Sequence, residues 1–367
     1  MRKWQSNVAV LVLLGLIGCA TIYVAIASTL SIEYPSAPTK QPPPKHQRTV
    51  STAPAPTRPT LSLPSQGPTM IAESEDEDHR AGKETVAKAR IIVMKTTDDP
   101  PQYYELCTLL AAGRLNPELN VHFLWSNFSS RSQFPAYLRV LPNFYPEKLH
   151  NQRIFANTPA ANWYKSEAWN VSHPIKRARF LSDAARNAYC WKHGCFYLDT
   201  DYILTKPIEG LQNVVAPQHS GEISNGFFQL PANSTLLLNA LQELVQTFDP
   251  SKKEIEFGPL MMTRLYRQME AENATDLPST LDPYMVYPFL YYEAEAMYRK
   301  KALLTKEDEK RTEEAYGIHL WHNKMLEKHD YGDLVPPPGS LLDAVAKKQC
   351  PEVHAEWSRL AVPRLLF

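Results

Sequence analysis

The sequence of 367 residues has no excess of charge of either sign. Its 39 lysines and arginines balance 39 aspartates and glutamates. Without a basic excess, electrostatics gives no reason to expect a nucleic acid partner. The chain also lacks a glycine-rich phosphate-binding loop, the cysteine spacing of a zinc site, and the larger histidine and aspartate cluster of a metallohydrolase. Other residues must therefore supply any site for a metal or a phosphate.

A long uncharged run lies close to the N-terminus. Residues 8–30 carry no charged side chain, and 23 helical residues are enough to cross a hydrocarbon layer of ~30 Å. Arg2 and Lys3 precede the run and Glu33 follows it, which predicts a membrane anchor with its N-terminus in the cytoplasm. The alternative is a cleaved signal peptide, because residues 25–27 resemble a cleavage site. Signal peptides, however, have apolar regions of only about 7 to 15 residues.

Proline, serine, threonine and charged residues dominate the segment from Tyr34 to about Gly82. Such a composition has too little apolar surface to offset the entropy lost on ordering, so we expect a disordered, extended stem. A folded domain is expected to begin near Ala87. The predicted division is a cytoplasmic tail at 1–7, a transmembrane signal anchor at 8–30, a stem at 31–86 and one catalytic domain at 87–367.

The folded part is predicted to start with a strand at 90–94, a helix at 104–112 and a second strand at 121–125. This βαβ order implies an α/β, Rossmann-like domain in which helices pack on a parallel sheet. Ligands of open α/β sheets collect beyond the carboxyl ends of the strands. Thr96 and Thr97 follow the first strand, so we expect them to meet a nucleotide.

Two aspartates follow a short apolar run later in the chain. Asp199 and Asp201 come directly after residues 195–198, which read as a buried strand. In an extended chain, residues two apart point to the same side, so both carboxylates can converge. Two hard oxygen ligands suit Mn²⁺ or Mg²⁺. Such a pair taken alone is usually a solvated turn.

A helical repeat of three and four residues precedes this strand, with Ser182 at a position suited to an N-cap and Gly194 as a stop. On this helix Asp183 and Arg186 share a face. A carboxylate that binds hydroxyls and a guanidinium that binds phosphate could both reach one ligand. The simpler alternative is an ion pair within the helix.

Together these features resemble the glycosyltransferases that carry a DXD motif, and more narrowly the α1,4-galactosyltransferase and α1,4-N-acetylglucosaminyltransferase family. The matching residues are Ser182-Asp183, Arg186, Gly194-Cys195, Tyr197 to Asp201, Asn225-Gly226-Phe227-Phe228, Gly258-Pro259 and the strand from Tyr316 to His322. Cys195 replaces the family's second glycine, which is expected to tighten the turn without removing a ligand. Glu256-Phe257 stands where the family's galactosyltransferases carry a His-Gln pair. If these residues touch the donor hexose or the acceptor, the choice of donor or acceptor is expected to differ here.

The resemblance implies a GT-A type fold, a UDP-sugar donor, Mn²⁺ or Mg²⁺, and retention of configuration to give an α-linkage. Asp201 is expected to hold the metal, Asp199 to orient the ribose or a metal-bound water, Asp183 to bind sugar hydroxyls, and Arg186 to stabilise the departing phosphate. These four are the expected catalytic residues. The expected metal ligands are Asp199, Asp201 and His319, and the expected nucleotide-sugar contacts are Thr96, Thr97, Asp183, Arg186 and Asn225. His319 is equally compatible with a hydrogen-bonded core position, and His322 is the weaker candidate.

The resemblance further implies a Golgi membrane enzyme of single-pass type II topology, with its catalytic domain in the lumen. It would transfer galactose or an N-acetylhexosamine from UDP-Gal, UDP-GalNAc or UDP-GlcNAc to a glycosphingolipid such as lactosylceramide, forming an α1,4-linkage. Transfer of α1,4-GlcNAc to mucin-type glycoproteins and a non-catalytic lumenal lectin are the alternatives. Glu222 and Glu256 are more typical of surface charges than of nucleophiles. Tyr287, Tyr291 and Tyr292 could line an acceptor platform or belong to the core.

Cys107, Cys190, Cys195 and Cys350 follow the predicted anchor, and four cysteines allow three pairings. Because Cys107 and Cys350 match family positions, the resemblance implies that these two are paired. Four glycosylation sequons, at Asn127, Asn170, Asn233 and Asn273, agree with a lumenal location.

Overall fold

The structure is a computed structural model, and it describes residues 89–171, 173–218, 221–253, 256–298, 305–322, 325 and 336–361. All of them belong to one compact unit. The predicted tail, anchor and stem at 1–7, 8–30 and 31–86 lie outside the described residues. Within the described part of the chain, no helix has the length and apolar character needed to cross a membrane.

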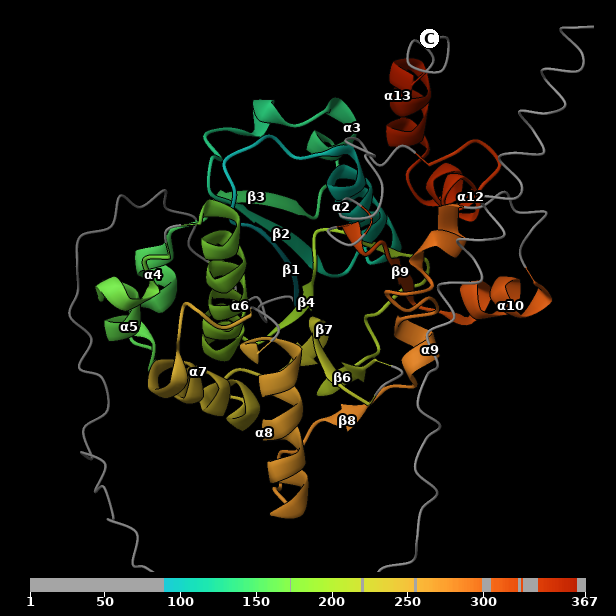
Figure 1. Cartoon of the computed structure of the whole chain (residues 1–367). Helices are drawn as coiled ribbons and strands as arrows, with labels where there is room; N and C mark the ends of the chain where they lie inside the picture. The colour runs from blue at the N-terminus through green and yellow to red at the C-terminus, as the bar shows by residue number, and fades with distance from the viewer. Residues whose placement is uncertain are drawn as a thin grey trace, which may run out of the picture. The chain divides into compact units, whose positions relative to one another are not determined.

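Seven strands form the main sheet, in the order β3-β2-β1-β4-β7-β6-β8 (Figure 1). Their bounds are β1 Arg90–Lys95, β2 Asn120–Trp125, β3 Phe144–Lys148, β4 Cys195–Leu198, β6 Val214–Pro217, β7 Ile223–Leu230 and β8 Ser279–Thr280. Strands β3, β2, β1 and β4 are parallel, while β7 runs antiparallel to both β4 and β6. The predicted parallel βαβ start is confirmed, and the sheet as a whole is mixed.

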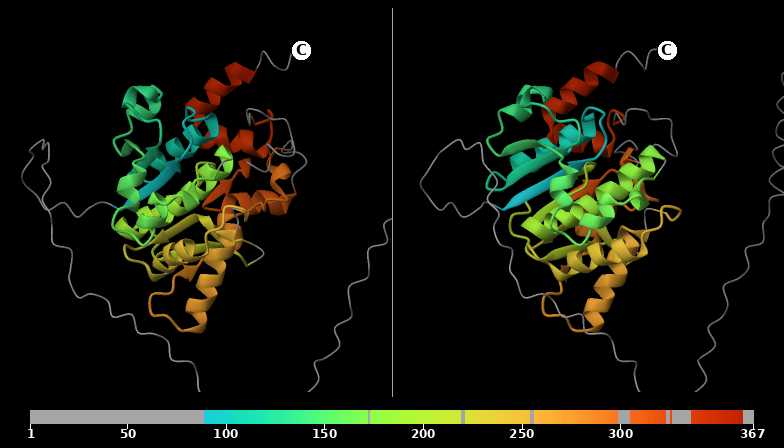
Figure 2. Two further views of the ribbon diagram at one scale, coloured as in Figure 1. Left: turned by 60° about the vertical axis from the view of Figure 1, so that its left-hand side comes forward. Right: turned by 90° about the vertical axis from the view of Figure 1, so that its left-hand side faces the viewer.

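Helices cover both faces of this sheet (Figure 2). Along β1, Ile91 and Val93 pack into one hydrophobic cluster and Ile92 and Met94 into the other. The first cluster is covered by α2 Tyr103–Leu115, α12 Leu341–Gln349 and α13 Pro351–Ala361, and the second by α6 Pro174–His193, α7 Thr235–Thr247 and α8 Pro259–Ala271. Because both faces are buried, the central strands read as continuous apolar runs.

Helix α6 begins much earlier than the sequence suggested. Its N-cap is His173, whose Nδ1 accepts a hydrogen bond from the Lys176 backbone N–H, and Pro174 occupies the first turn. The expectation of an N-cap at Ser182 was wrong, because Ser182 lies in the middle of the helix. The predicted stop is confirmed: Gly194 adopts a φ of 63°, and a Cβ there would collide with the backbone of Ala232.

A small second sheet joins distant parts of the chain. Strand β5 (Tyr202–Leu204) pairs antiparallel with β9 (Gly317–His319), and Tyr202 lies opposite His319. This pairing brings the C-terminal strand to the residues that directly follow Asp201. The shorter described elements are η1 Arg131–Gln133, α3 Ala136–Arg139, α4 Asn151–Phe155, α5 Ala161–Lys165, η2 Glu167–Trp169, α9 Pro283–Val286, η4 Ala294–Tyr298 and α10 Lys306–Glu314.

Two disulfides connect these elements. Cys107 in α2 is bonded to Cys350 at the end of α12, so the pairing implied by the resemblance is confirmed. The second disulfide joins Cys190 near the end of α6 to Cys195 at the start of β4, across the turn at Gly194. The four sequon asparagines, Asn127, Asn170, Asn233 and Asn273, are all exposed.

Candidate active site

Asp199, Asp201 and His319 form a cluster beyond the carboxyl end of β4. Nε2 of His319 lies 3.1 Å from Oδ1 of Asp201 and 3.8 Å from Oδ2 of Asp199. The two carboxylates converge as expected. They do so in a turn between β4 and β5, however, because residues 199–201 are not part of either strand. His319 enters from β9 through the β5–β9 pairing.

The donor set of this cluster fits a divalent cation. One ligand atom from each of the three residues can be chosen so that all lie within 4.8 Å of one another. Among the described residues, the buried Nδ1 of His319 has no hydrogen-bond partner, and packing against the rings of Tyr202, Tyr287 and Trp321 sets the position of the imidazole. Two carboxylates and one imidazole are ligands that divalent cations commonly take in proteins.

The electrostatics of the cluster favour an ionised Asp201. Burial alone would raise the pKa of Asp201, but the neighbouring His319 and the backbone N–H of His322 lower it below its ordinary value. Burial would lower the pKa of His319, whereas Asp201 and Asp199 raise it. Because two carboxyl groups face one imidazole, the cluster favours a cation over an anion.

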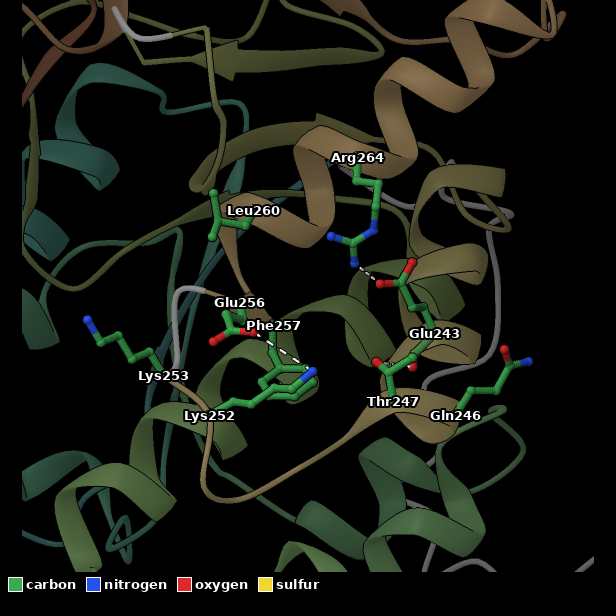
Figure 3. Close-up of a pocket in the computed structure, with 9 residues that line it drawn as sticks. All are labelled: Glu243, Gln246, Thr247, Lys252, Lys253, Glu256, Phe257, Leu260 and Arg264. Atoms are coloured by element: carbon green, nitrogen blue, oxygen red, sulfur yellow. Dashed lines mark hydrogen bonds and ion pairs between the residues drawn. The ribbon is translucent and has the colours of Figure 1, made fainter.

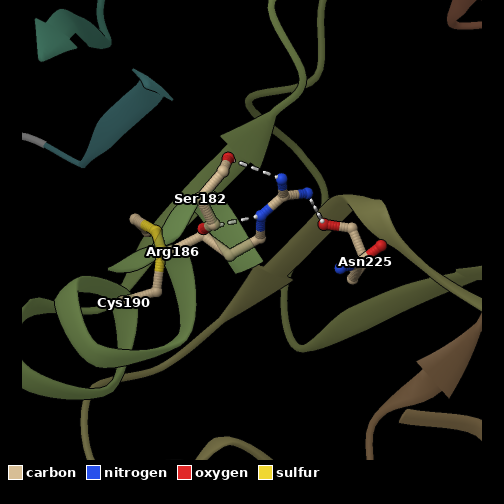
Figure 4. Close-up of a disulfide and its surroundings, with 5 residues drawn as sticks. Ser182, Arg186, Cys190 and Asn225 are labelled. Atoms are coloured by element: carbon tan, nitrogen blue, oxygen red, sulfur yellow. Dashed lines mark hydrogen bonds between the residues drawn. A yellow bond between two sulfur atoms is a disulfide. The ribbon is translucent and has the colours of Figure 1, made fainter. Parts of the chain in front are cut away.

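Arg186 connects helix α6 to the strands on either side of the cluster. Its Nη1 donates to Oδ1 of Asp199 and to the backbone oxygen of Asn225, both at 2.8 Å. Its Nη2 donates to Oγ of Ser182 at 2.8 Å and lies 3.3 Å from Oδ1 of Asp183. Its Nε donates to the backbone oxygen of Ser182 (Figure 4). The guanidinium therefore makes four hydrogen bonds to protein oxygens, and Nη2 also forms an ion pair with Asp183.

The ion pair within the helix that we considered as an alternative is thus present, but Arg186 also holds β4 and β7. Burial would lower its pKa, yet the carboxylates of Asp199 and Asp183 raise it, so the charge is permanent. The guanidinium also lies 4.5 Å above the ring of Tyr197. The expected contact of Arg186 with a departing phosphate stays a prediction.

Asp183 points toward the same site. Its Oδ1 accepts a hydrogen bond of 2.7 Å from Nδ2 of Asn225 on β7. The backbone of Gly258, at the start of α8, lies against the Asn225 amide, so a Cβ at position 258 would come within 2.9 Å of Nδ2. The family-like segments around Asn225 and Gly258 are therefore neighbours of Asp183 in space.

Gly226 is a part of the site whose role the sequence did not reveal. Its backbone oxygen accepts the Asp199 N–H at 2.9 Å, and a Cβ at this position would overlap the Asp199 carboxylate. Lys95 is another residue whose contacts the sequence did not reveal. Its Nζ, buried at the end of β1, lies 3.0 Å from Glu105 and 2.8 Å from Asp99. A glycine inside a strand and a lysine at the end of an apolar strand were the available signals.

Thr96 lies just beyond β1, the strand next to β4. Its hydroxyl donates to the backbone oxygen of Ala178 at 3.0 Å and so ties the end of β1 to α6. The Thr97 backbone oxygen accepts hydrogen bonds from the side chains of Trp125 and Ser126. The predicted contact of both threonines with a nucleotide is untested by these interactions.

Several other predicted residues lie elsewhere or act differently. Tyr287 is core: it is 1% exposed and its hydroxyl donates to Ser224 at 2.6 Å. Because β9 ends at His319 and Trp321 adopts a φ of 52°, strand alternation does not extend to His322. The backbone N–H of His322 instead donates to Oδ2 of Asp201 at 2.9 Å.

Glu256 lines an open pocket of about 750 Å³, in which its carboxylate faces Lys252 at 3.9 Å (Figure 3). The lining residues come from the end of α7, the start of α8 and the segment between them, and they are Glu243, Gln246, Thr247, Lys252, Lys253, Glu256, Phe257, Leu260 and Arg264. None of the cluster residues lines this pocket. Its position supports the interpretation of Glu256 as a surface charge.

Comparisons with known proteins agree with this geometry. Residues 94–221 match the family model described as a glycosyltransferase sugar-binding region containing a DXD motif. Residues 230–357 match the one described as an alpha 1,4-glycosyltransferase conserved region. The two matches contain Asp183, Arg186, Asp199 and Asp201 in the first and His319 in the second.

Individual relatives are similar over most of the folded part. Human alpha-1,4-N-acetylglucosaminyltransferase is 26% identical over 284 residues, which are 72% of this chain and 80% of the relative. Mouse lactosylceramide 4-alpha-galactosyltransferase is 26% identical over 281 residues, 73% of this chain and 76% of the relative. The solved PaToxG glycosyltransferase is 14% identical, covers 62% of this chain and 85% of that chain, and gives a TM-score of 0.42. With both family models matched in order, this chain belongs to the α1,4-glycosyltransferase family with a DXD motif, and it is a glycosyltransferase.

Proposed function

We propose that this chain transfers galactose or an N-acetylhexosamine from a UDP-sugar to a β-galactoside-ended glycosphingolipid, such as lactosylceramide, with an α1,4-linkage. The observation that carries the proposal is the convergence of Asp199, Asp201 and His319 beside Asp183 and Arg186. A GT-A type domain presents its donor site at the carboxyl end of a parallel sheet, and this cluster follows β4 in that position.

Each residue of the site has a role in this proposal. Asp199, Asp201 and His319 would hold Mn²⁺ or Mg²⁺, and the bound cation would neutralise charge on the diphosphate leaving group. Asp183 accepts hydrogen bonds from hydroxyls of the donor sugar. Arg186 keeps Asp183 and Asp199 in place through its fixed set of N–H donors.

Thr96, Thr97 and Asn225 complete the proposed donor site. Thr96 and Thr97 lie beyond β1, next to the strand that leads to the aspartates, on the side where a nucleotide base or ribose would bind. Asn225 bridges Asp183 to β7 and offers its remaining amide atoms to the donor.

Retention of configuration fits a same-face displacement. The bond between the anomeric carbon and the diphosphate oxygen breaks as the acceptor hydroxyl oxygen bonds to that carbon. The hydroxyl proton passes to the departing phosphate oxygen. In this scheme no carboxylate of the chain acts as a nucleophile, which agrees with the position of Glu256 in a separate pocket.

Transfer of α1,4-linked GlcNAc to mucin-type glycans is the second candidate. It is favoured by the human N-acetylglucosaminyltransferase, which is as similar to this chain as the mouse galactosyltransferase. We also propose a Golgi membrane location with the catalytic domain in the lumen. Two disulfides support an oxidising compartment, and the membrane contact is assigned to residues 8–30.

Release of UDP by the purified full-length chain tests the proposal. UDP-Gal, UDP-GalNAc and UDP-GlcNAc are supplied in turn with Mn²⁺ and with methyl β-lactoside or lactosylceramide. We expect turnover with one donor, lost on chelation and in Asp201→Asn. Asp276→Asn changes an exposed carboxylate that caps α7 and serves as the matched control. Equal turnover in Asp201→Asn and in the wild type would refute the proposal.

A further inference from the structure

A line of aromatic rings leads outward from the Asp199, Asp201 and His319 cluster. The His319 and Trp321 rings meet edge to face with centroids 4.2 Å apart, the Tyr291 ring lies 6.3 Å from Trp321, and the Tyr292 ring lies 5.2 Å from Tyr291. We call Trp321, Tyr291 and Tyr292 the aromatic strip. It runs from the mostly buried imidazole to the surface.

Trp321 is held firmly at the inner end of the strip. Its indole N–H donates to the backbone oxygen of Phe289 at 2.8 Å, and the core ring of Tyr287 packs 5.7 Å behind it. Its φ of 52° is unusual for a bulky L-residue and is maintained only because the surroundings hold it. With the polar N–H already bonded, the indole offers an apolar ring surface to a ligand.

The two tyrosines at the outer end are not core residues. Tyr291 is 48% exposed and Tyr292 is 58% exposed, whereas Tyr287, four positions earlier in the chain, is 1% exposed. Among the large hydrophobic side chains exposed in the described part of the chain, these are the two that follow one another directly. Large rings left in water next to a reaction centre are typical of a surface that another molecule covers.

We propose that the aromatic strip binds the acceptor, with the apolar face of its terminal β-galactose packed on the rings. This inference rests on the proposed function, because it names where the substrate of that reaction lies. The C–H groups on one face of galactose carry slight positive charge and complement the negative faces of aromatic rings. The hydroxyl of Tyr292 can meanwhile exchange hydrogen bonds with the sugar and with water.

The position of the strip favours the acceptor over other ligands. The donor must reach Asp183 and the metal cluster, and the acceptor hydroxyl must reach the same anomeric carbon from beside it. The strip starts at the ring that touches His319, so a sugar packed there places its hydroxyl next to the cluster. The open pocket beside Glu256 is a poorer candidate, because Glu256 pairs with Lys252, Glu243 pairs with Arg264, and Phe257 is only 3% exposed.

The test compares acceptor KM for methyl β-lactoside in the full-length chain, with Mn²⁺ and the preferred UDP-sugar at saturation. In Tyr291→Ala/Tyr292→Ala we expect acceptor KM to rise roughly ten- to a hundredfold while UDP affinity is retained. Tyr291→Phe/Tyr292→Phe keeps both rings and should recover most of the wild-type KM. Tyr284→Ala removes a 38% exposed tyrosine that lies over Arg311 and should leave KM unchanged.

An unchanged acceptor KM in the double alanine variant would overturn the inference without affecting the proposed function. Conversely, a wild-type chain that neither turns over nor binds UDP would refute the proposed function. The strip is then tested by saturation-transfer NMR with methyl β-lactoside alone. Binding that is lost in Tyr291→Ala/Tyr292→Ala but kept in Tyr284→Ala supports the strip, and absence of binding to the wild type overturns it.

Discussion

Asp199 lies against the backbone of Gly226, with no side chain between the two residues. We therefore expect Gly226→Ala to push the carboxylate away from His319 and to lower metal-dependent turnover by roughly a hundredfold, since displacements of about 1 Å can cost that much. Gly210→Ala is the matched control, because nothing lies within 4 Å of the Cβ it would add. The prediction is tested by comparing the rates of UDP release in Gly226→Ala, Gly210→Ala and the wild type. Normal turnover in Gly226→Ala would show that Asp199 needs no fixed position.

Arg186 provides a second prediction about single residues. Lysine keeps the charge but cannot reach Asp199, Asn225 and Ser182 together, so buried acceptors lose their donors. Arg186→Lys should lower the free energy of unfolding by about 1–3 kcal/mol and reduce turnover more than it raises donor KM. Denaturant titration and steady-state kinetics measure the two effects. Arg264→Lys, at a side chain that is 57% exposed, should change neither.

The residues that contact one another locally were the predictable part of the site. Asp199 and Asp201 follow an apolar run, and Asp183 and Arg186 are three apart on one helix. The contact of Gly226 with Asp199 was not predictable, and neither were the ion pairs of Lys95. Gly226 matters through an overlap with a residue 27 positions away, whereas Lys95 pairs with Glu105 in α2 and with Asp99 in the segment before α2. Local patterns carry no information about such overlaps.

At the scale of elements, the disulfide between α2 and α12 makes a measurable contribution. It closes a loop of 243 residues, and the entropy that a cross-link removes from the unfolded chain grows with loop length. Cys107→Ser/Cys350→Ser should therefore lower the free energy of unfolding by about 2–5 kcal/mol, measured by urea titration. The Cys190–Cys195 bond closes a loop of only five residues, so Cys190→Ser/Cys195→Ser should lower the free energy of unfolding by less.

The same pair of variants separates stability from activity. The Cys190–Cys195 bond spans the turn between the helix that carries Arg186 and the strand that leads to Asp199. Its removal should lower turnover even where the urea midpoint moves little. A larger loss of stability in Cys190→Ser/Cys195→Ser than in Cys107→Ser/Cys350→Ser would contradict this division of roles.

The bounds of helices and strands were predictable where a residue that starts or stops the element lies next to its hydrophobic pattern. The helix stop at Gly194 and the βαβ start were clear, because a glycine and two short apolar runs on either side of a helical segment specify them directly. The start of α6 was missed since its signal, His173-Pro174, lies two turns before Ser182. The β5–β9 pairing joins residues more than a hundred positions apart, and neither strand is longer than three residues. Short strands of this kind have no distinctive periodicity.

At the scale of the whole molecule, metal binding should stabilise the fold. A cation held by Asp201 and His319 joins the middle of the chain to its C-terminal strand, and it binds only the folded state. At a concentration of one hundred times its Kd, Mn²⁺ should add about 2.7 kcal/mol and raise Tm, as measured by thermal denaturation with and without chelator. Asp201→Asn should abolish the shift. A shift of equal size in that variant would place the cation elsewhere.

The α/β class followed from the order of patterns, because alternating strands and helices leave few ways to bury both faces of a sheet. The presence of both parallel and antiparallel strands in the sheet did not follow from that order. Strand β7 is antiparallel to its neighbours β4 and β6. Its sequence mixes polar and apolar residues, and such a composition does not specify the direction of a strand.

The disulfide between Cys107 and Cys350 also orders events during biosynthesis. A ribosome adds about 5–20 residues per second, so Cys107 is synthesised on the order of 10 to 50 s before its partner. Cys190 and Cys195 emerge in that interval, almost together, and can close their own short loop first. Once these two thiols are paired with each other, they cannot form a non-native bond with Cys107. Because Cys107 stays unpaired until most of the chain has been made, we expect early closure of the Cys190–Cys195 bond to favour the correct Cys107–Cys350 pairing.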